Sequence, residues 1–227
     1  MNEASKTMHY FSGLLNPIFE GRTILDIGAG LDPIKPWAYV FDMEQGNAQD
    51  ISKYGLNKFG CVFSSHCLEH MSDPLTALQT WWELVESQGY LIFIVPEEDL
   101  YEQGNFPSIF NGDHKATFTL GKESSWSNKS NGIYDLIGNL KGGSIKYCKI
   151  QDNGYERDNQ NFRFKLKKLY HFLRSNSMKI FRVLNPIMVG LRLWPIDQTS
   201  LGDLRLAQIM VILQKVDKSI VYENKIS

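Results

Sequence analysis

The chain has few cysteines, and they are poorly spaced for cross-linking or for zinc. Only three occur among its 227 residues, Cys61, Cys67 and Cys148, and none of them forms a C-x-x-C pair. An odd number of scattered cysteines argues against a disulfide framework and against a cysteine-based structural zinc site. We therefore expect reduced thiols, as in a cytoplasmic protein.

The chain also lacks long apolar runs and an excess of charge of one sign. Its start, MNEASKTMHYFSGLL, has no basic segment followed by a long apolar stretch, and no later stretch reaches about 18 consecutive apolar residues. Its 24 basic and 25 acidic residues nearly cancel, so the overall charge gives no reason to expect nucleic-acid binding. We expect a soluble cytoplasmic protein that is not exported.

Six short apolar runs, rich in branched and aromatic residues, predict the strands of one sheet. They cover residues 23–27, 38–41, 60–64, 90–95, 145–150 and 207–213. Between the third and fourth runs, a segment that starts at Asp73-Pro74 has apolar residues at helical spacing, at Leu75, Leu78, Trp82 and Val85. Because parallel strands need such crossovers, we predict an α/β fold: a Rossmann-like, mostly parallel sheet with helices on both faces.

The length and the hydrophobic content of 43% fit a single domain, residues 1–227, with one elaboration. We expect that elaboration as a helical insertion or cap over residues 155–200, before the last strand. Lys141 to Arg182 contains eleven Lys or Arg and three acidic residues, a local net charge of plus eight. This block could be a cap packed on its own sheet, a membrane-facing surface, a dimer interface or a nucleic-acid site. One predicted apolar face carries Phe162, Leu166, Leu169, Tyr170 and Leu173, and the basic face carries Lys167, Lys168, His171 and Arg174.

An acidic residue precedes the glycines of TILDIGAGLDP, residues 23–33. Gly28 and Gly30 directly follow a predicted strand, where glycine lets the backbone approach a ligand closely. The dinucleotide-binding pattern requires a third glycine where this chain has Pro33, and the carboxylate of Asp26 would repel a pyrophosphate. A carboxylate there suits a ligand with an ammonium or a sulfonium group, and S-adenosylmethionine carries both. The alternative is a glycine turn in another kind of α/β protein.

Two further segments offer groups for the rest of such a ligand. Asp42 ends the next predicted strand, where a carboxylate can accept hydrogen bonds from both hydroxyls of a ribose. In GNAQDI, Asn47 can offer its amide oxygen to an adenine amino group, and Ala48 its backbone amide to a ring nitrogen. A solvated strand end and a plain turn are the alternatives.

Taken in order, ILDIGAG, the Asp42 strand end, GNAQDI, CVFSSHCLEHMSDP and WWELVESQGYLIFIVP resemble class I S-adenosylmethionine-dependent methyltransferases. With NGDHKATFTL, they are most similar to small bacterial enzymes of surface-polysaccharide or sugar modification. The resemblance covers residues 21–120 and returns at DQTSLGDLRLAQIMVILQKV. It implies S-adenosylmethionine as cofactor and a small-molecule acceptor such as a saccharide or a nucleotide sugar. The implied cofactor-binding residues are Asp26, Gly28, Ala29, Gly30, Asp42, Asn47, Ala48, Ser64, Ser65 and His66.

The chain departs from the family pattern at two places. The adenine position usually holds Asp, and here it holds Asn47, whose amide oxygen can still accept a hydrogen bond. Pro33 and Pro36 leave almost no room for a helix between Gly30 and the strand that ends at Asp42. We therefore predict an abbreviated cofactor loop.

Histidines in the segment HCLEH, residues 66–70, are candidates for the chemistry. The segment matches the H-x-x-E-H pattern of inverted zinc peptidases, but that site needs a continuing helix, and Pro74 follows too soon. We expect no metal. In the methyltransferase interpretation, His66 or His70 acts as general base, with His70 first by position. Glu69 is expected to face the other way. The alternative is that both histidines only brace the loop.

A second polar segment, FNGDHKATFTL, offers Asp113, His114 and Lys115. An Asp113-His114 pair could take a proton from a hydroxyl, and Lys115 could contact an anionic acceptor. The alternative is a solvated turn. The sequence as a whole predicts an enzyme that methylates an oxygen of a small acceptor, with a nitrogen as the other choice. The interpretation from a different class is a catalytically silent methyltransferase fold that serves as a binding or scaffold protein.

Overall fold

The structure is a computed structural model, and it describes residues 3–157, 166, 169–170, 172–191, 193–200 and 204–216. Its main sheet has six strands in the order β2-β1-β3-β4-β8-β7. These are β1 (Ile24–Ile27), β2 (Tyr39–Phe41), β3 (Phe59–Ser65), β4 (Val85–Pro96), β7 (Gly143–Gln151) and β8 (Gln208–Lys215). A small second sheet pairs β5 (Thr117–Thr119) with β6 (Ser130–Gly132).

The first four strands of the main sheet run parallel, whereas β8 runs antiparallel to both β4 and β7. Each of the six apolar runs in the sequence corresponds to one of these strands. The predicted Rossmann-like, mostly parallel sheet is therefore confirmed. In such a sheet, ligands bind beyond the carboxyl ends of the strands.

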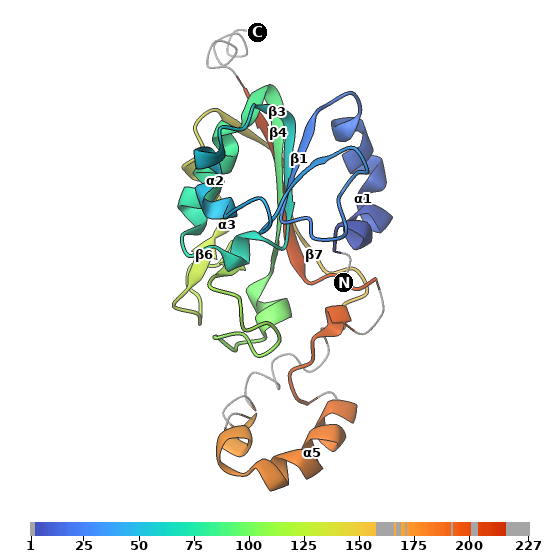
Figure 1. The fold of residues 1–227 in the computed structure, drawn as a ribbon. Coiled ribbons are helices and arrows are strands. Elements are labelled where there is room, and N and C mark those ends of the chain that lie inside the picture. The colour runs from blue at the N-terminus through green and yellow to red at the C-terminus, as the bar shows by residue number, and fades with distance from the viewer. Residues whose placement is uncertain are drawn as a thin grey trace, which may run out of the picture.

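Helices cover both faces of the sheet. Helix α1 (Glu3–Phe19) lies on one face, and α2 (Pro74–Glu83) with α3 (Ile133–Gly138) lies on the other (Figure 1). Because both faces of the sheet are covered, stretches of the central strands such as residues 90–95 are continuously apolar, as in other doubly covered parallel sheets.

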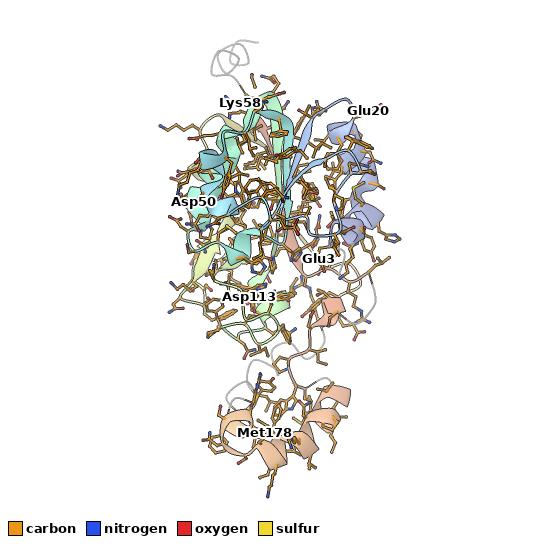
Figure 2. All side chains as sticks on the ribbon, in the orientation of Figure 1. Glu3, Glu20, Asp50, Lys58, Asp113 and Met178 are labelled. Atoms are coloured by element: carbon orange, nitrogen blue, oxygen red, sulfur yellow. The ribbon has the colours of Figure 1, made fainter. Side chains whose placement is uncertain are left out.

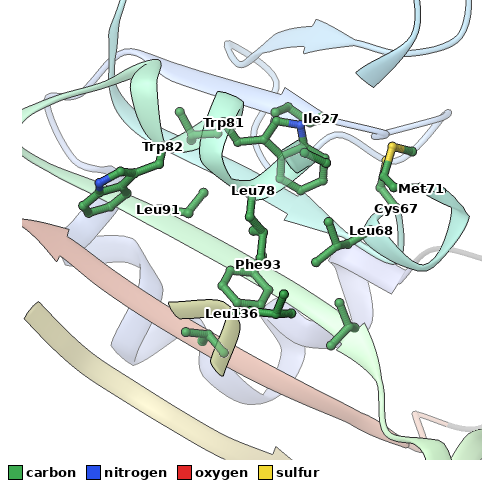
Figure 3. Close-up of a cluster of buried hydrophobic side chains, with 14 of the residues drawn as sticks. Ile27, Cys67, Leu68, Met71, Leu78, Trp81, Trp82, Leu91, Phe93 and Leu136 are labelled. Carbon is green, nitrogen blue, oxygen red and sulfur yellow. The ribbon is translucent and has the colours of Figure 1, made fainter. Parts of the chain in front are cut away.

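The core on the α2 side is filled by large side chains. Trp81 is fully buried and packs with Leu78 and Phe93 (Figure 3). The indole N–H of Trp81 donates to the carbonyl of Ala48, and that of Trp82 to the carbonyl of Lys141. Both tryptophans are thus core residues whose polar atoms are satisfied, and neither is a stacking platform for a ligand.

Two elements differ from the sequence predictions. Helix α1 was not predicted, although Ala4, Leu15 and Phe19 recur at helical spacing and are buried. Helix α2 begins as predicted, with the Asp73 side chain accepting from the amide of Thr76, but it ends at Glu83. Val85, expected on that helix, instead begins β4, where it pairs with Phe59 and is fully buried.

Short helical turns occupy the loops at the carboxyl ends of the strands. They are η1 (Ala48–Tyr54), η2 (Leu68–His70), η3 (Glu98–Glu102) and η4 (Gln198–Ser200). No helix separates β1 from β2, a stretch that the structure describes completely. The predicted abbreviation of the cofactor loop is thus confirmed, and the two strands are joined by a short non-helical segment.

Helix α5 (Met178–Gly190) lies beyond the carboxyl ends of the strands, apart from the sheet (Figure 1). It contributes to a small cluster around the buried Tyr170, Leu173 and Trp194. Leu169, predicted on the buried face, is 44% exposed, because the cluster contacts only one side of this segment. Phe162, Lys167, Lys168 and His171 lie outside the described residues. The single domain with an insertion at residues 155–200 stays a prediction.

Among the described residues, the structure has no helix with the length and apolar character needed to cross a membrane.

Candidate active site

Two neighbouring cavities open where β1, β2 and β3 end. The larger has a volume of about 880 Å³, and its lining residues include Gly28, Asp42, Asn47, Ala48, His66, Cys67, His70, Met71, Asp113 and Lys115. The smaller has a volume of about 370 Å³ and is lined in part by Glu3, Asp26, Gly28, Ala29, Gly30, Ser65 and His66. Gly28 and His66 line both, so the two cavities adjoin. Most of the predicted cofactor residues therefore lie around one continuous region (Figure 2 shows this end of the sheet near Asp113 and Glu3).

Asp26 is a buried carboxylate at the end of β1. It is 1% exposed, and its Oδ2 accepts a hydrogen bond of 2.7 Å from the amide of Ile34. Burial raises the pKa of Asp26 to about 7, and the nearby carboxylates of Asp32 and Asp42 add to the rise. A cationic ligand group beside Asp26 would lower this pKa again.

The glycines after Asp26 take conformations that side chains rarely adopt. Gly28 has a φ of 77°, and a Cβ there would lie 2.6 Å from the Cβ of Cys67. Gly30 has a φ of 56°, and its amide donates to Oδ2 of Asp42 at 2.6 Å. The other oxygen of Asp42 accepts from the amide of Met43 at 2.7 Å. Asp42 thus ties the glycine loop to the end of β2 while it lines the larger cavity.

Of the remaining predicted cofactor residues, Asn47, Ala48 and Ser65 line a cavity, whereas Ser64 does not. Asn47 caps η1, with its Oδ1 accepting from the amide of Gln49 at 3.0 Å, and it lines the larger cavity with Ala48. Ser65 lines the smaller cavity, and its buried hydroxyl has no hydrogen-bond partner among the described residues. Ser64 lines neither cavity, because its hydroxyl donates to the carbonyl of Ile27 within the sheet.

Three histidines surround one buried carboxylate, Glu69. Its Oε1 lies 3.5 Å from Nδ1 of His66, 4.0 Å from Nε2 of His70 and 4.0 Å from Nε2 of His114. Glu69 is 1% exposed, and although burial opposes its charge, the histidines lower its pKa below the usual range. The expectation that Glu69 faces away from His70 is therefore wrong: η2 is a single three-residue turn, which directs both side chains to the same cluster.

Each of these histidines has its other ring nitrogen engaged. Nε2 of His66 lies 3.0 Å from Oε1 of Gln208, and Nδ1 of His70 lies 3.2 Å from the carbonyl of Asp113. Burial lowers the pKa of His66, but Glu69 and Glu3 outweigh burial and raise this pKa to about 9. His66 is thus a cation at neutral pH.

His114 is paired with Glu102 and not with its sequence neighbour Asp113, the partner that we expected. Its Nδ1 lies 2.6 Å from Oε1 of Glu102, and both side chains are almost fully buried. Asp113 contributes its backbone carbonyl to His70 and lines the larger cavity. Glu69 stands in the H-x-x-E-H segment and could have been found there, whereas no local pattern marks Glu102.

The comparisons with known proteins bear on the family and on the fold. A sequence-family model described as "Methyltransferase domain" matches residues 26–93, which run from Asp26 through the glycine loop and η2 into β4. Residues 26–93 carry a methyltransferase domain. The protein is accordingly an enzyme, an S-adenosylmethionine-dependent methyltransferase. The search of curated proteins found no match.

Several solved structures are similar to this chain at low sequence identity. A Listeria monocytogenes protein described as an S-adenosylmethionine-dependent methyltransferase has 13% identity and a TM-score of 0.50, with 94% of this chain and 100% of that chain covered. A Galdieria sulphuraria protein described as a sarcosine dimethylglycine methyltransferase has 15% identity and a TM-score of 0.48, covering 93% and 85%. A methyltransferase from Archaeoglobus fulgidus has 15% identity and a TM-score of 0.44, covering 93% and 92%. At 13% identity, the similarity to the Listeria monocytogenes structure supports the fold of this chain and nothing about its substrate.

The residues around the two cavities fit S-adenosylmethionine. The larger cavity lies within the range of about 300–1,000 Å³ that is usual for small-molecule sites. A buried carboxylate, Asp26, and the unpaired hydroxyl of Ser65 face the smaller cavity, where they suit the ammonium and carboxylate of an amino-acid moiety. Asp42 and Asn47 offer acceptors in the larger cavity, as an adenosyl group requires.

The pKa of Asp26 predicts a pH dependence for cofactor affinity. An ammonium group interacts with the ionised carboxylate, so affinity should fall as the pH drops below about 7 and Asp26 takes up a proton. We expect a loss on the order of 10-fold between about pH 7.5 and 5.5, measured by calorimetric titration with S-adenosylmethionine. Asp26→Asn should bind more weakly and lose most of this dependence. An equally steep profile in Asp26→Asn would assign the pH effect to another group.

Proposed function

We propose that this methyltransferase methylates an oxygen of a small acceptor, a saccharide or sugar-linked group in surface-polysaccharide biosynthesis. The observation that carries the proposal is the histidine cluster at the wall of the cofactor cavity: His70 and Asp113 line the same cavity as Asp42 and Asn47. A neutral hydroxyl is a poor nucleophile and needs such groups, whereas an amine does not. A buried, charged cluster is also costly to fold, and a silent scaffold protein would have no use for it.

The chain's own residues hold the cofactor in this proposal. Asp42 accepts hydrogen bonds from the ribose, and Asn47 with Ala48 contacts the adenine. Asp26 and the backbone of residues 28–30 contact the methionine part, together with Ser65 and His66. When bound, S-adenosylmethionine supplies a methyl group on a positively charged sulfur. Most of the rate then comes from alignment of the acceptor with that methyl group.

His70 is the residue that we propose prepares the acceptor hydroxyl. Its side chain is 32% exposed and lines the larger cavity, whereas that of His114 is 3% exposed. His66 also lines the cavity, but Gln208 and Glu69 face both of its ring nitrogens. Lys115 and Asp113, on the facing loop, lie where they could contact the acceptor's polar groups.

Labelled methyl transfer tests the acceptor class. With labelled S-adenosylmethionine, we expect methylation of hydroxyls among a panel of nucleotide sugars and lipid-linked oligosaccharides, identified by mass spectrometry. Transfer to amines alone would assign N-methylation instead. Cofactor binding without transfer to any acceptor of the panel would favour the scaffold alternative.

Asp42→Ala tests the cofactor assignment. Two ribose hydroxyls lose a charged acceptor, worth about 1.5–3 kcal/mol, so S-adenosylmethionine should bind about 10- to 150-fold more weakly in titration calorimetry. Asp152→Ala removes a carboxylate that is paired with Arg157 and lines neither cavity, and it serves as the matched control. Unchanged affinity in Asp42→Ala would remove Asp42 from the site. NADH binding as tight as that of S-adenosylmethionine would contradict the cofactor itself.

We also propose that the basic block (Lys141 to Arg182), together with the rest of α5, contacts an anionic membrane surface, as an enzyme of polysaccharide assembly would. Apolar side chains of α5 are exposed, among them Ile180, Val183 and Ile187, and basic Lys179 and Arg182 are interspersed with them. Amphipathic helices of this composition bind anionic lipid through apolar burial and charge.

Liposome sedimentation tests this surface. Vesicles with anionic lipid should retain the protein at low salt and release it as salt screens the charges, and neutral vesicles should retain less. Val183→Glu with Ile187→Glu should abolish retention without changing the affinity for S-adenosylmethionine. If no retention occurs at low salt, the cap and dimer interpretations of the block remain.

A further inference from the structure

Two separate loops bring potential metal ligands together beside the cofactor cavity. One oxygen of Glu69 and one ring nitrogen each of His70 and His114 lie within 4.8 Å of one another. Neither oxygen of the buried Glu69 carboxylate makes a hydrogen bond to a described residue, and the nearest nitrogen is Nδ1 of His66 at 3.5 Å. Glu69 thus has one cationic neighbour, His66, but no hydrogen bond, and burial removes the hydration that would otherwise stabilise its charge. A cation between Glu69 and the two histidines would offset that loss.

The two histidine rings are oriented as metal ligands are. A carbonyl only accepts hydrogen bonds, so Nδ1 of His70 donates to Asp113, which leaves its Nε2 facing Glu69 and available to a metal ion. Nδ1 of His114 likewise faces the carboxylate of Glu102 at 2.6 Å, which leaves Nε2 toward Glu69. In metal sites the second nitrogen of a ligating histidine almost always donates to a carboxylate, a backbone carbonyl or a water, as here.

The backbone fixes the two loops against each other. The amides of Lys115 and Ala116 both donate to the carbonyl of Glu69, at 2.7 and 3.2 Å. Tyr101 stacks on the His114 ring at 5.3 Å between centroids. Ligand atoms around a tetrahedral ion with bonds of about 2.0–2.1 Å lie about 3.3 Å apart. The two 4.0 Å separations therefore need to close by less than about 1 Å, and the widest separation of the triad, up to 4.8 Å, by about 1.5 Å at most.

We infer that Glu69, His70 and His114 bind a divalent first-row transition metal ion such as Zn²⁺ or Mn²⁺. Two imidazoles and one carboxylate suit these ions, whereas Mg²⁺ and Ca²⁺ prefer oxygen ligands. Three protein ligands leave a coordination position free, and one of the three, the partly exposed His70, lines the larger cavity. The site differs from the peptidase pattern that we set aside, because His114 from another loop replaces the first histidine of H-x-x-E-H.

This inference rests on the proposed function and names how the acceptor becomes reactive. A hydroxyl that coordinates the ion in place of water loses its proton to solvent far more readily, since a bound divalent ion can lower the pKa of water to about 7. In this arrangement His70 would hold the ion as a ligand and would not itself take the proton of the hydroxyl. The acceptor oxygen would thereby be held at a fixed place beside the cofactor residues.

Calorimetric titration of chelator-treated, dialysed protein with Zn²⁺, Mn²⁺ and Mg²⁺ tests the site. We expect one equivalent of Zn²⁺ or Mn²⁺ to bind, with Mg²⁺ at least about 10-fold weaker. Glu69→Gln keeps the side-chain volume but removes the charge. This change and His114→Ala should each lower the affinity for the metal ion by about 100-fold or more. Glu102→Gln should weaken it by about 10- to 100-fold. His9→Ala removes an exposed histidine of α1 and should change nothing.

Two results would overturn the metal site: no saturable equivalent in the wild-type protein, or unchanged binding in Glu69→Gln and His114→Ala. Circular dichroism and titration with S-adenosylmethionine report whether each variant folds. If the buried Glu69 variant does not fold, His70→Ala, at a partly exposed position, gives the same comparison. The cofactor titration needs no metal, so the two proposals can fail separately. Binding of S-adenosylmethionine without binding of metal overturns this inference alone. Binding of metal without binding of S-adenosylmethionine overturns the proposed function alone.

Discussion

Replacing His70 by alanine is expected to lower turnover by about 100- to 10,000-fold and to leave the affinity for S-adenosylmethionine nearly unchanged. An alcohol holds its proton at neutral pH, and the group that helps to remove it acts mainly in the transition state. The structure places Nε2 of His70 next to Glu69 at the cavity wall, and it provides no equally exposed histidine among the other candidates. The loss should therefore appear in kcat far more than in cofactor binding.

Steady-state kinetics with an identified acceptor, together with cofactor titration, measure this effect. His9→Ala is the matched control, because it removes an exposed histidine from α1. His114→Ala should be the next most damaging change, since His114 shares Glu69 with His70. Full turnover in His70→Ala would move the role to His114 or Asp113. Full turnover in all of these variants would mean that the acceptor arrives already nucleophilic, as an amine or a phosphate-like oxygen.

Sequence patterns predicted the sheet well because its strands are covered on both faces. Runs such as residues 90–95 are continuously apolar, and the start signal Asp73-Pro74 marks the crossover helix. The end of that helix was missed for the same reason: Val85 fits both a helical stripe and a buried strand, and pairing with Phe59 decides for the strand. Periodicity alone cannot make this choice, because the partner strand is remote in sequence.

Short motifs could predict which strand ends line the two cavities, but not the contact between two loops. Asp26, Gly28 and Asp42 belong to short strand-end motifs, and they line the two cavities. Glu69 and Glu102 acquire their meaning only from the contact of η2 with the loop around His114, which depends on backbone hydrogen bonds such as that from Lys115 to Glu69. A nonlocal contact of this kind leaves no trace in residue spacing.

Gly28→Ala is the second change with a large expected effect. A side chain at a φ of 77° costs about 1–2 kcal/mol, and the added Cβ would lie 2.6 and 2.7 Å from Cβ and Sγ of Cys67. Such overpacking typically costs a further 1–3 kcal/mol or so. We expect the free energy of unfolding to fall by about 2–5 kcal/mol and the melting temperature by about 5–15 °C.

The same change should also weaken cofactor binding, because Gly28 lines both cavities and Cys67 lines the larger one, so any shift that relieves the clash moves the cavity wall. Thermal unfolding and cofactor titration measure the two effects separately. Gly13→Ala is the control: this helical glycine has open space around its missing Cβ, and alanine there should be neutral or stabilising by up to about 1 kcal/mol. Adding Cys67→Gly to Gly28→Ala removes both clashing atoms and should restore the packing part of the loss but not the part due to φ. A double variant no better than Gly28→Ala would show that backbone strain alone explains the requirement for glycine at the cofactor loop.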